Sequence, residues 1–190
     1  MFQLPPNHDD FAHILGIDPG SETLGVSCIS VNPYTLEIVY TQAVTFIGSK
    51  LNMNPQMLDT HSARFARIAA HQKNLKNLFT EIMPVSIVCE SPFFNPRRPN
   101  AFAPLVETLD AIRRAVWEYD QVQTLELVDP PTVKMAVGCR GNADQDAMNL
   151  AVMALPDLNY CGAIPFYQLD EHSIDAIAVA YSKICQYRGK

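Results

Sequence analysis

The sequence predicts one α/β domain, built on a mixed five-stranded sheet with helices on both faces. The chain has 190 residues, of which 48% are hydrophobic and 18% charged, and this balance suits a compact domain with a sizeable core. Three strand-like runs follow one another near the start, and helical and strand-like patterns then alternate to the end. We therefore expect an antiparallel meander extended by parallel strands.

Each element follows from the spacing of apolar residues and from the turn residues between runs. Strands are expected where apolar or β-branched runs stop at turns such as Pro19-Gly20. Helices are expected where apolar residues recur every three or four positions, as in the long amphipathic segment that Pro84 ends. The expected strands are residues 13–18, 23–31, 36–47, 85–89 and 122–128, and the expected helices are 56–83, 101–119, 132–137, 143–154 and 171–186.

Cysteine usage and the first residues indicate the compartment. The five cysteines are widely spaced without a C-x-x-C pair, which favours reduced thiols over disulfides or structural zinc. The start has no basic segment followed by an apolar run, and no stretch approaches the roughly 18 apolar residues of a membrane span. We expect a flexible leader at residues 1–12, a single domain at residues 13–190, a cytoplasmic location and no membrane contact.

The overall charge argues weakly against nucleic acid as a partner. Fourteen basic and twenty acidic residues give a formal net charge of −6, so nothing global attracts a polyanion. Binding to DNA would require a local basic surface on an acidic body.

Acidic residues stand where α/β folds place their chemistry, at the carboxyl ends of strands. Asp18 ends the first expected strand, and Glu90 ends the fourth. His172 and Asp175 are three residues apart on one face of the last helix, followed by small apolar residues that let the helix lie close to a sheet. If that helix end meets those strand ends, three carboxylates and an imidazole converge.

Clustered carboxylates repel one another and destabilise a fold unless a cation neutralises them, so such clusters usually hold a divalent metal. An oxygen-rich ligand set suits Mg²⁺ or Mn²⁺. The reaction typical of this arrangement is two-metal phosphodiester hydrolysis, in which one ion activates water and the other stabilises the leaving oxygen.

Each residue also has an ordinary structural interpretation. Asp18 fits a common turn, and Glu90 fits a solvated strand end. Asp175 fits an ion pair with Lys183 or an arginine, and His172 fits an exposed residue at a helix start. Only their convergence favours a site.

Four short blocks occur in order: ILGIDPGS at residues 14–21, VCESPFF at 88–94, PTVKMAV with GNAD at 131–144, and DAIAVA at 175–180. Together they resemble the RuvC-type Holliday junction resolvases of the RNase H-like superfamily, and they suit a phage or divergent member. The resemblance implies an RNase H-like fold and a metal-dependent endonuclease of DNA recombination and repair. Such an enzyme resolves four-way junctions by paired phosphodiester hydrolysis with two Mg²⁺ ions per active site, for which Mn²⁺ substitutes.

Carried over by position, the resemblance implies that Asp18, Glu90 and Asp175 are metal-binding catalytic carboxylates. His172 stands at the family's remaining acidic position, which implies a metal ligand or a proton-transfer group, with Asp170 and Glu171 as nearby substitutes.

The resemblance also extends to basic positions. Lys134 matches a lysine that lies close to the scissile phosphate, where its charge would offset developing negative charge. The family's second basic position is Gln145 here, and Arg140 is our candidate for the missing charge.

The loop after Glu90 carries the candidate DNA contacts. Phe93 matches an aromatic residue that wedges into the junction and stacks on bases, an interaction worth about 1–3 kcal/mol per base. Phe93 or its neighbour Phe94 could equally anchor the loop in the core. Arg97 and Arg98 suit phosphate contacts beside the wedge. Basic residues of the expected helix 56–83 extend that surface or form a solvated face: Arg64, Arg67, Lys73 and Lys76.

Family members act as two-fold symmetric dimers, so the resemblance implies a homodimer matched to a near two-fold symmetric junction. The expected helix at 101–119 is the candidate for much of the interface, and an intrachain core helix is the alternative. The candidate contacts are Leu105, Leu109, Ile112, Val116 and Trp117.

Three other functions remain open. The same blocks fit a broader debranching nuclease or a ribonuclease of the superfamily. Residues 16–21 also resemble the first phosphate loop of actin-like kinases and ATPases, but those proteins enclose nucleotide between two domains, so we expect no nucleotide cofactor. A catalytically silent junction-binding module is favoured if His172 and Gln145 mark loss of activity.

Overall fold

The computed structural model describes residue 2, residues 7–93, residue 96 and residues 99–189. The strands are β1 (Ala12–Asp18), β2 (Thr23–Val31), β3 (Ile38–Ile47), β4 (Ser86–Glu90) and β5 (Leu125–Val128). They form one sheet in the order β3-β2-β1-β4-β5. The β1–β2 and β2–β3 pairs are antiparallel, whereas the β1–β4 and β4–β5 pairs are parallel. The predicted mixed sheet, a meander extended by parallel strands, is confirmed.

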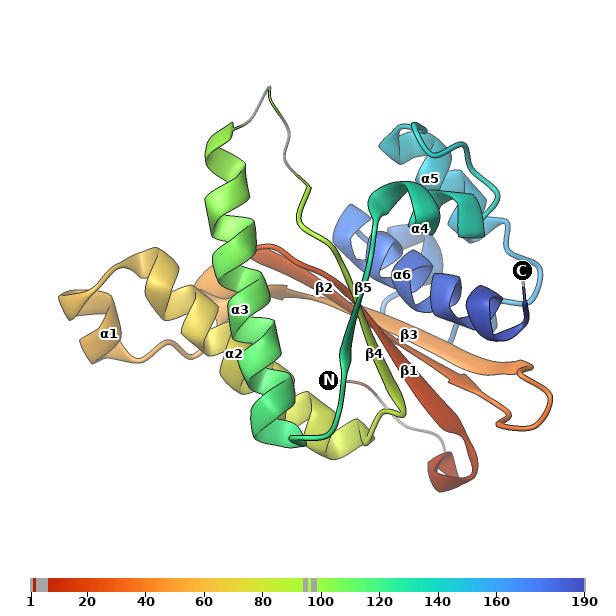
Figure 1. Cartoon of the computed structure of the whole chain (residues 1–190), viewed down its shortest axis with the longest axis horizontal. Coiled ribbons are helices and arrows are strands. Elements are labelled where there is room, and N and C mark those ends of the chain that lie inside the picture. The colour runs from red at the N-terminus through yellow and green to blue at the C-terminus, as the bar shows by residue number, and fades with distance from the viewer. Residues whose placement is uncertain (1, 3–6, 94–95, 97–98, 190) are drawn as a thin grey trace.

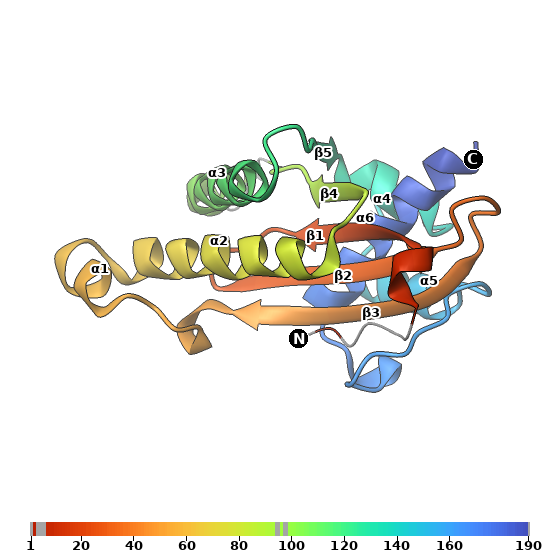
Figure 2. The same ribbon diagram turned by 90° about the horizontal axis from the view of Figure 1, so that it is seen from below.

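Helices cover both faces of this sheet. The α-helices are α1 (Pro55–Thr60), α2 (Ala63–Ile82), α3 (Phe102–Tyr119), α4 (Pro130–Ala136), α5 (Gln145–Met153) and α6 (Glu171–Tyr187). Short 3₁₀ turns are η1 (His8–Asp10), η2 (Gly48–Lys50), η3 (Pro99–Ala101) and η4 (Phe166–Gln168). Helices α2 and α3 lie on one face, and α4, α5 and α6 lie on the other (Figures 1 and 2).

Each face of the sheet has its own apolar core. Side chains alternate along β1, so that Ile14 packs towards α6 while Leu15 and Ile17 pack towards α2 and α3. Phe2 is buried in the second of these cores. Burial on both faces explains why β1 reads as a continuous apolar run rather than an alternating one.

The helix expected at residues 56–83 is two helices, so that prediction was wrong. The chain leaves α1 at His61, and the Ser62 side chain accepts a hydrogen bond from the backbone N–H of Phe65 at the start of α2. A serine in this position satisfies a free donor of the first turn and so favours a new helix start. Apolar spacing did not reveal the break because it continues on both sides of it.

Helix α3 is mainly a core helix of its own chain. Leu109, Ile112 and Val116 are buried against the sheet and α2, so these three residues are not available for the interface expected from them. Trp117 does reach the surface, with 60% of its area exposed. Within the described residues, no helix combines the length and apolar character needed to cross a membrane.

Candidate active site

Helix α6 packs directly onto β1 and β2 through small residues. A Cβ atom at Gly16 would lie 2.2 Å from the carbonyl oxygen of Ala176, and one at Gly25 would lie 2.0 Å from the carbonyl oxygen of His172. Any larger residue at either position would push the helix away. This close approach brings the first turn of α6 to the carboxyl end of β1, as the small residues after Asp175 predicted.

The start of α6 is fixed by a cap. The Asp170 carboxylate accepts hydrogen bonds from the Ser173 backbone N–H at 2.9 Å and from the Thr45 hydroxyl of β3 at 2.6 Å. These bonds hold the pKa of Asp170 below its ordinary value, although burial acts in the opposite direction. Asp170 therefore caps α6 and, through the Thr45 hydroxyl, ties the start of the helix to β3.

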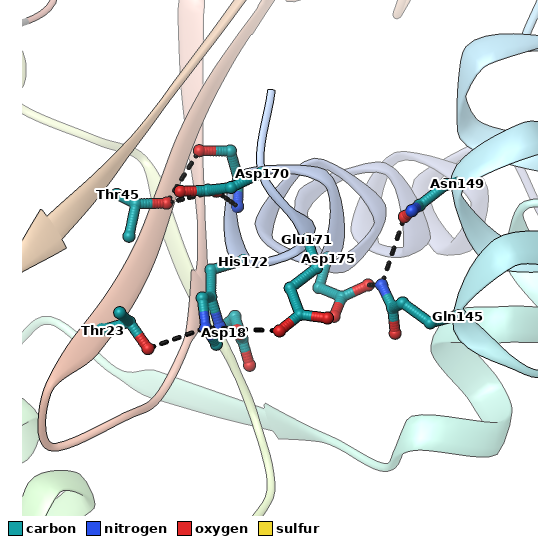
Figure 3. A network of polar contacts seen from close by, with 10 residues as sticks. Asp18, Thr23, Thr45, Gln145, Asn149, Asp170, Glu171, His172 and Asp175 are labelled. Carbon is teal, nitrogen blue, oxygen red and sulfur yellow. Dashed lines mark hydrogen bonds and ion pairs between the residues drawn. The ribbon is translucent and has the colours of Figure 1, made fainter. Parts of the chain in front are cut away.

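His172 bridges Asp18 and β2 (Figure 3). Its Nδ1 lies 2.8 Å from Oδ2 of Asp18, and its Nε2 lies 2.7 Å from the hydroxyl oxygen of Thr23. Because a carboxylate only accepts, Nδ1 carries the hydrogen, and a neutral ring then accepts from Thr23 through Nε2. The hydrogen bond to Asp18 raises the pKa of His172, while burial raises the pKa of Asp18 despite that bond.

Three carboxylates line one cleft of about 360 Å³. Asp18 comes from the end of β1, Glu90 from the end of β4 and Asp175 from the first turns of α6. Lys134 of α4 and Gln145 of α5 complete the polar wall. The apolar part of the lining includes Phe93, Leu105 and Met148.

The carboxylates carry more negative charge than the cleft neutralises. Burial raises the pKa of Glu90 to about 8, and repulsion from Asp18 and Asp175 adds to the shift. Burial also raises the pKa of Asp175 to about 6, against a hydrogen bond from Gln145. The Lys134 ammonium lowers the pKa of Glu90 only in part, and it also donates a hydrogen bond to the Ala143 carbonyl. Such a site favours a cation.

The side chains do not form a closed metal cage as they stand. Nowhere in the described ranges are three or more His, Cys, Asp and Glu side chains arranged closely enough to hold an ion. Both ring nitrogens of His172 are engaged, and Asp175 is held by Gln145. The donor chemistry nevertheless fits a hard divalent cation, because desolvated carboxylate oxygens repel one another and no thiolate or free imidazole competes with them.

The candidate DNA contacts divide into three groups. Phe93 lines the cleft and is 64% exposed. Arg140 is exposed, but it is not part of the cleft wall. The remaining candidates lie outside the described residues: Phe94, Arg97 and Arg98.

Two basic residues of α2 are already paired. Arg64 forms an ion pair with Glu107 at 2.9 Å, and Arg67 forms one with Glu22 at 2.9 Å. The contact favours the solvated-face interpretation for Arg64, whose side chain is 49% exposed, whereas Arg67 is only 24% exposed and lies against Gly48.

Sequence reasoning missed two side chains of this network. Thr23 contacts His172 and Asn149 contacts Gln145, but neither belongs to a motif: Thr23 begins β2, away from the carboxyl ends of strands, and Asn149 lies within α5. Gln145 itself was noted only as a missing basic residue, although its amide donates to Asp175 at 2.9 Å.

No known protein-family model matches the chain, and no curated protein sequence matches it. The fold is nevertheless shared with solved structures and is RNase H-like. Within that class it is the fold of RuvC from Thermus thermophilus, which is 20% identical, with a TM-score of 0.64 over 93% of this chain and 96% of that one. RuvC of the same organism in complex with Holliday junction substrate is 22% identical, with a TM-score of 0.67 over 94% and 96% of the two chains.

Proposed function

We propose that the protein is a metal-dependent endonuclease that resolves four-way DNA junctions by paired phosphodiester hydrolysis. The observation that carries the proposal is the single cleft lined by Asp18, Glu90 and Asp175, whose carboxylates repel one another, with Lys134 also in its wall. The choice of substrate is supported by the shared fold of RuvC, one structure of which contains a Holliday junction substrate.

The three carboxylates are the proposed ligands of two divalent ions, Mg²⁺ or Mn²⁺. When bound, such ions would supply water activation and stabilisation of the leaving oxygen. Burial is the main cause of the raised pKa of Glu90, and a bound cation would offset both that burial and the added repulsion from Asp18 and Asp175.

Neighbouring residues orient the carboxylates and the DNA. His172 holds Asp18 through its Nδ1–H and is placed to carry a proton, a role we prefer to that of ligand because both ring nitrogens are engaged. Lys134 would offset charge at the scissile phosphate. The exposed ring of Phe93 would stack on an unpaired base at the rim of the cleft.

We further infer a homodimer, since two cleaving sites related by a two-fold axis suit a near two-fold symmetric junction. The exposed Trp117 on the outer side of α3 is the contact that we would test first. A cytoplasmic location suits the five free cysteines.

One assay tests the proposal: purified protein with Mg²⁺ is incubated with four-way, three-way, flap, linear and RNA substrates, and the nicks on every strand are mapped. We expect symmetrically paired nicks in the four-way junction and little cutting of linear duplex. Equal cutting of all branched substrates would favour a debranching nuclease, and cutting of RNA would favour a ribonuclease. Two further measurements test the remaining alternatives. Band shifts without metal and without nicks would favour a silent binding module. ATP hydrolysis, measured in a separate incubation with ATP, would favour the actin-like interpretation.

A further inference from the structure

The two aspartates of the cleft are each held by a side chain that has its own support (Figure 3). Asp18 contacts His172, which is bonded to Thr23. Asp175 contacts Gln145, which is bonded to Asn149. The first arrangement involves an ionisable ring, whereas the second consists of two neutral amides.

One amide nitrogen makes both contacts of Gln145. Its Nε2 lies 2.9 Å from Oδ1 of Asp175 and 3.2 Å from Oδ1 of Asn149. A primary amide nitrogen has two hydrogens, so these two acceptors use both of them. Asn149 is four residues after Gln145, which places the two side chains on the same face of α5.

The helix that carries this pair is itself held firmly. The Asp144 side chain caps α5 by accepting a hydrogen bond from the Ala147 backbone N–H at 2.9 Å. Met148 and Val152 of α5 are buried in the core that α6 shares. The Gln145 amide therefore extends from a fixed backbone towards another fixed helix, which is the arrangement that keeps a ligand oriented.

We propose that Gln145, supported by Asn149, is a positioning residue that holds the Asp175 carboxylate by Oδ1 and leaves its second oxygen for a divalent cation. Unlike a lysine, the neutral amide fixes the carboxylate without competing with the cation for its charge. This inference rests on the proposed function only in taking Asp175 as a metal ligand.

Metal binding by the full chain tests the inference without a cleavage assay. Calorimetric titration with Mn²⁺ is expected to show at least about 10-fold weaker binding for Gln145→Leu, because loss of a partner behind a metal ligand typically costs 10- to 100-fold in affinity. Gln121→Leu, the same change at an exposed turn residue, is the matched control and should bind as the wild type does. Binding by Gln145→Leu within two-fold of the wild type would overturn the proposal.

Asn149 provides the second variant, for use if Gln145→Leu does not fold. Asn149→Leu alone should weaken Mn²⁺ binding by about 3-fold, and binding equal to that of the wild type would overturn the role given to Asn149. If Gln145→Leu does fold, the double variant should bind no more weakly than Gln145→Leu, because the two residues act as one unit. Independent, additive losses would instead indicate a merely structural role. In cleavage assays, the half-saturating Mg²⁺ concentration should rise while kcat at saturating metal changes less.

The outcomes separate this inference from the proposed function. A wild-type protein that binds Mn²⁺ but cuts no branched DNA would reject the nuclease, while the affinity ratio would still decide the role of Gln145. A wild-type protein that binds no Mn²⁺ would overturn both.

Discussion

Two cavities on the same sheet differ in how the charged side chains in their walls are balanced. The larger, about 570 Å³, lies between β5, α4 and α6, and its only buried charge among the described residues is Lys183, which is 8% exposed. Lys183 forms an ion pair with Glu126 and donates to Gln186 at 2.8 Å, so it is not the partner of Asp175 that the sequence allowed. The smaller cavity, about 360 Å³, is the carboxylate cleft.

If the proposed function holds, unbalanced charge is a better guide to the active site than cavity volume is. In the larger cavity, Glu126 already neutralises Lys183, so no unbalanced charge remains there for a ligand to neutralise. The three carboxylates of the cleft are only partly exposed and have raised pKa values, and groups perturbed in this way are found mainly where they serve function.

The largest expected difference between the cavities is in catalysis. Asp18→Asn or Glu90→Gln should lower junction cleavage at least about 1000-fold, because each removes a charge from a unit that acts together. Gel assays with labelled four-way junctions in Mg²⁺ measure the rate, and band shifts in Ca²⁺ should show that binding survives. The control is the double variant Lys183→Met, Glu126→Gln in the larger cavity, which should cleave junctions at close to the wild-type rate. Undiminished cleavage by Asp18→Asn would contradict the view that the carboxylate cleft is catalytic and the Lys183 cavity is not.

The next effect concerns stability and should appear in the larger cavity. Lys183→Met alone leaves Glu126 without its cation, and we expect it to lower the free energy of unfolding by about 1–3 kcal/mol. The value lies below that of a fully buried pair because the Glu126 side chain is 38% exposed. Urea denaturation of the single and double variants measures it, and the added Glu126→Gln should recover part of the loss. If Lys183→Met is as stable as the wild type, the Lys183–Glu126 ion pair contributes nothing to the free energy of unfolding.

Local patterns predicted the parts of this molecule that local chemistry determines. The ends of β1 and β4 are marked by turn residues, and the alanines after Asp175 indicated how closely α6 packs. Asp18 and Glu90 could therefore be placed at the same sheet edge from the sequence. The break between α1 and α2 depends on a single capping serine within a continuous helical spacing, and the sequence pattern did not show it.

Side-chain partners far apart in the chain could not be predicted in this way. Thr23 and His172 are 149 residues apart, and their contact depends on the final position of α6 against β2. The partner of Gln145 depends equally on how α5 packs on α6. Leu109 and Ile112 have a spacing that suits either an interface or a core, and only the packed structure shows that they are buried.

A third difference should appear as a pH dependence of the metal-free protein. The pKa of Glu90 is raised from 4.5 to about 8, so between these values the folded state keeps a proton that the unfolded chain has lost. The free energy of unfolding should therefore fall as pH rises through this range, by a few kcal/mol at most, since one unit of pKa difference is worth about 1.4 kcal/mol. Glu90→Gln should flatten the fall, and added Mn²⁺ should reverse it. Glu126→Gln in the larger cavity is the matched control, and an equal response of the two variants would contradict the comparison.

The smallest effect is a loss of stability as pH falls, opposite in direction to the effect of Glu90. It comes from the face of the sheet that α2 and α3 cover. His71 of α2 is fully buried, and burial lowers its pKa from 6.5 to about 4. Below pH 6.5 the unfolded chain binds a proton that the folded histidine does not, so the free energy of unfolding should fall as pH drops towards 4, by at most about 3 kcal/mol at about 1.4 kcal/mol per pKa unit. Comparing wild type with His71→Leu isolates this slope from the carboxylates, and His61→Leu, at an exposed position, should leave it unchanged. Because His71 lies beneath Gly48 and away from the cleft, Mn²⁺ should not alter this slope; a metal-sensitive slope would place the acid transition in the carboxylate site instead.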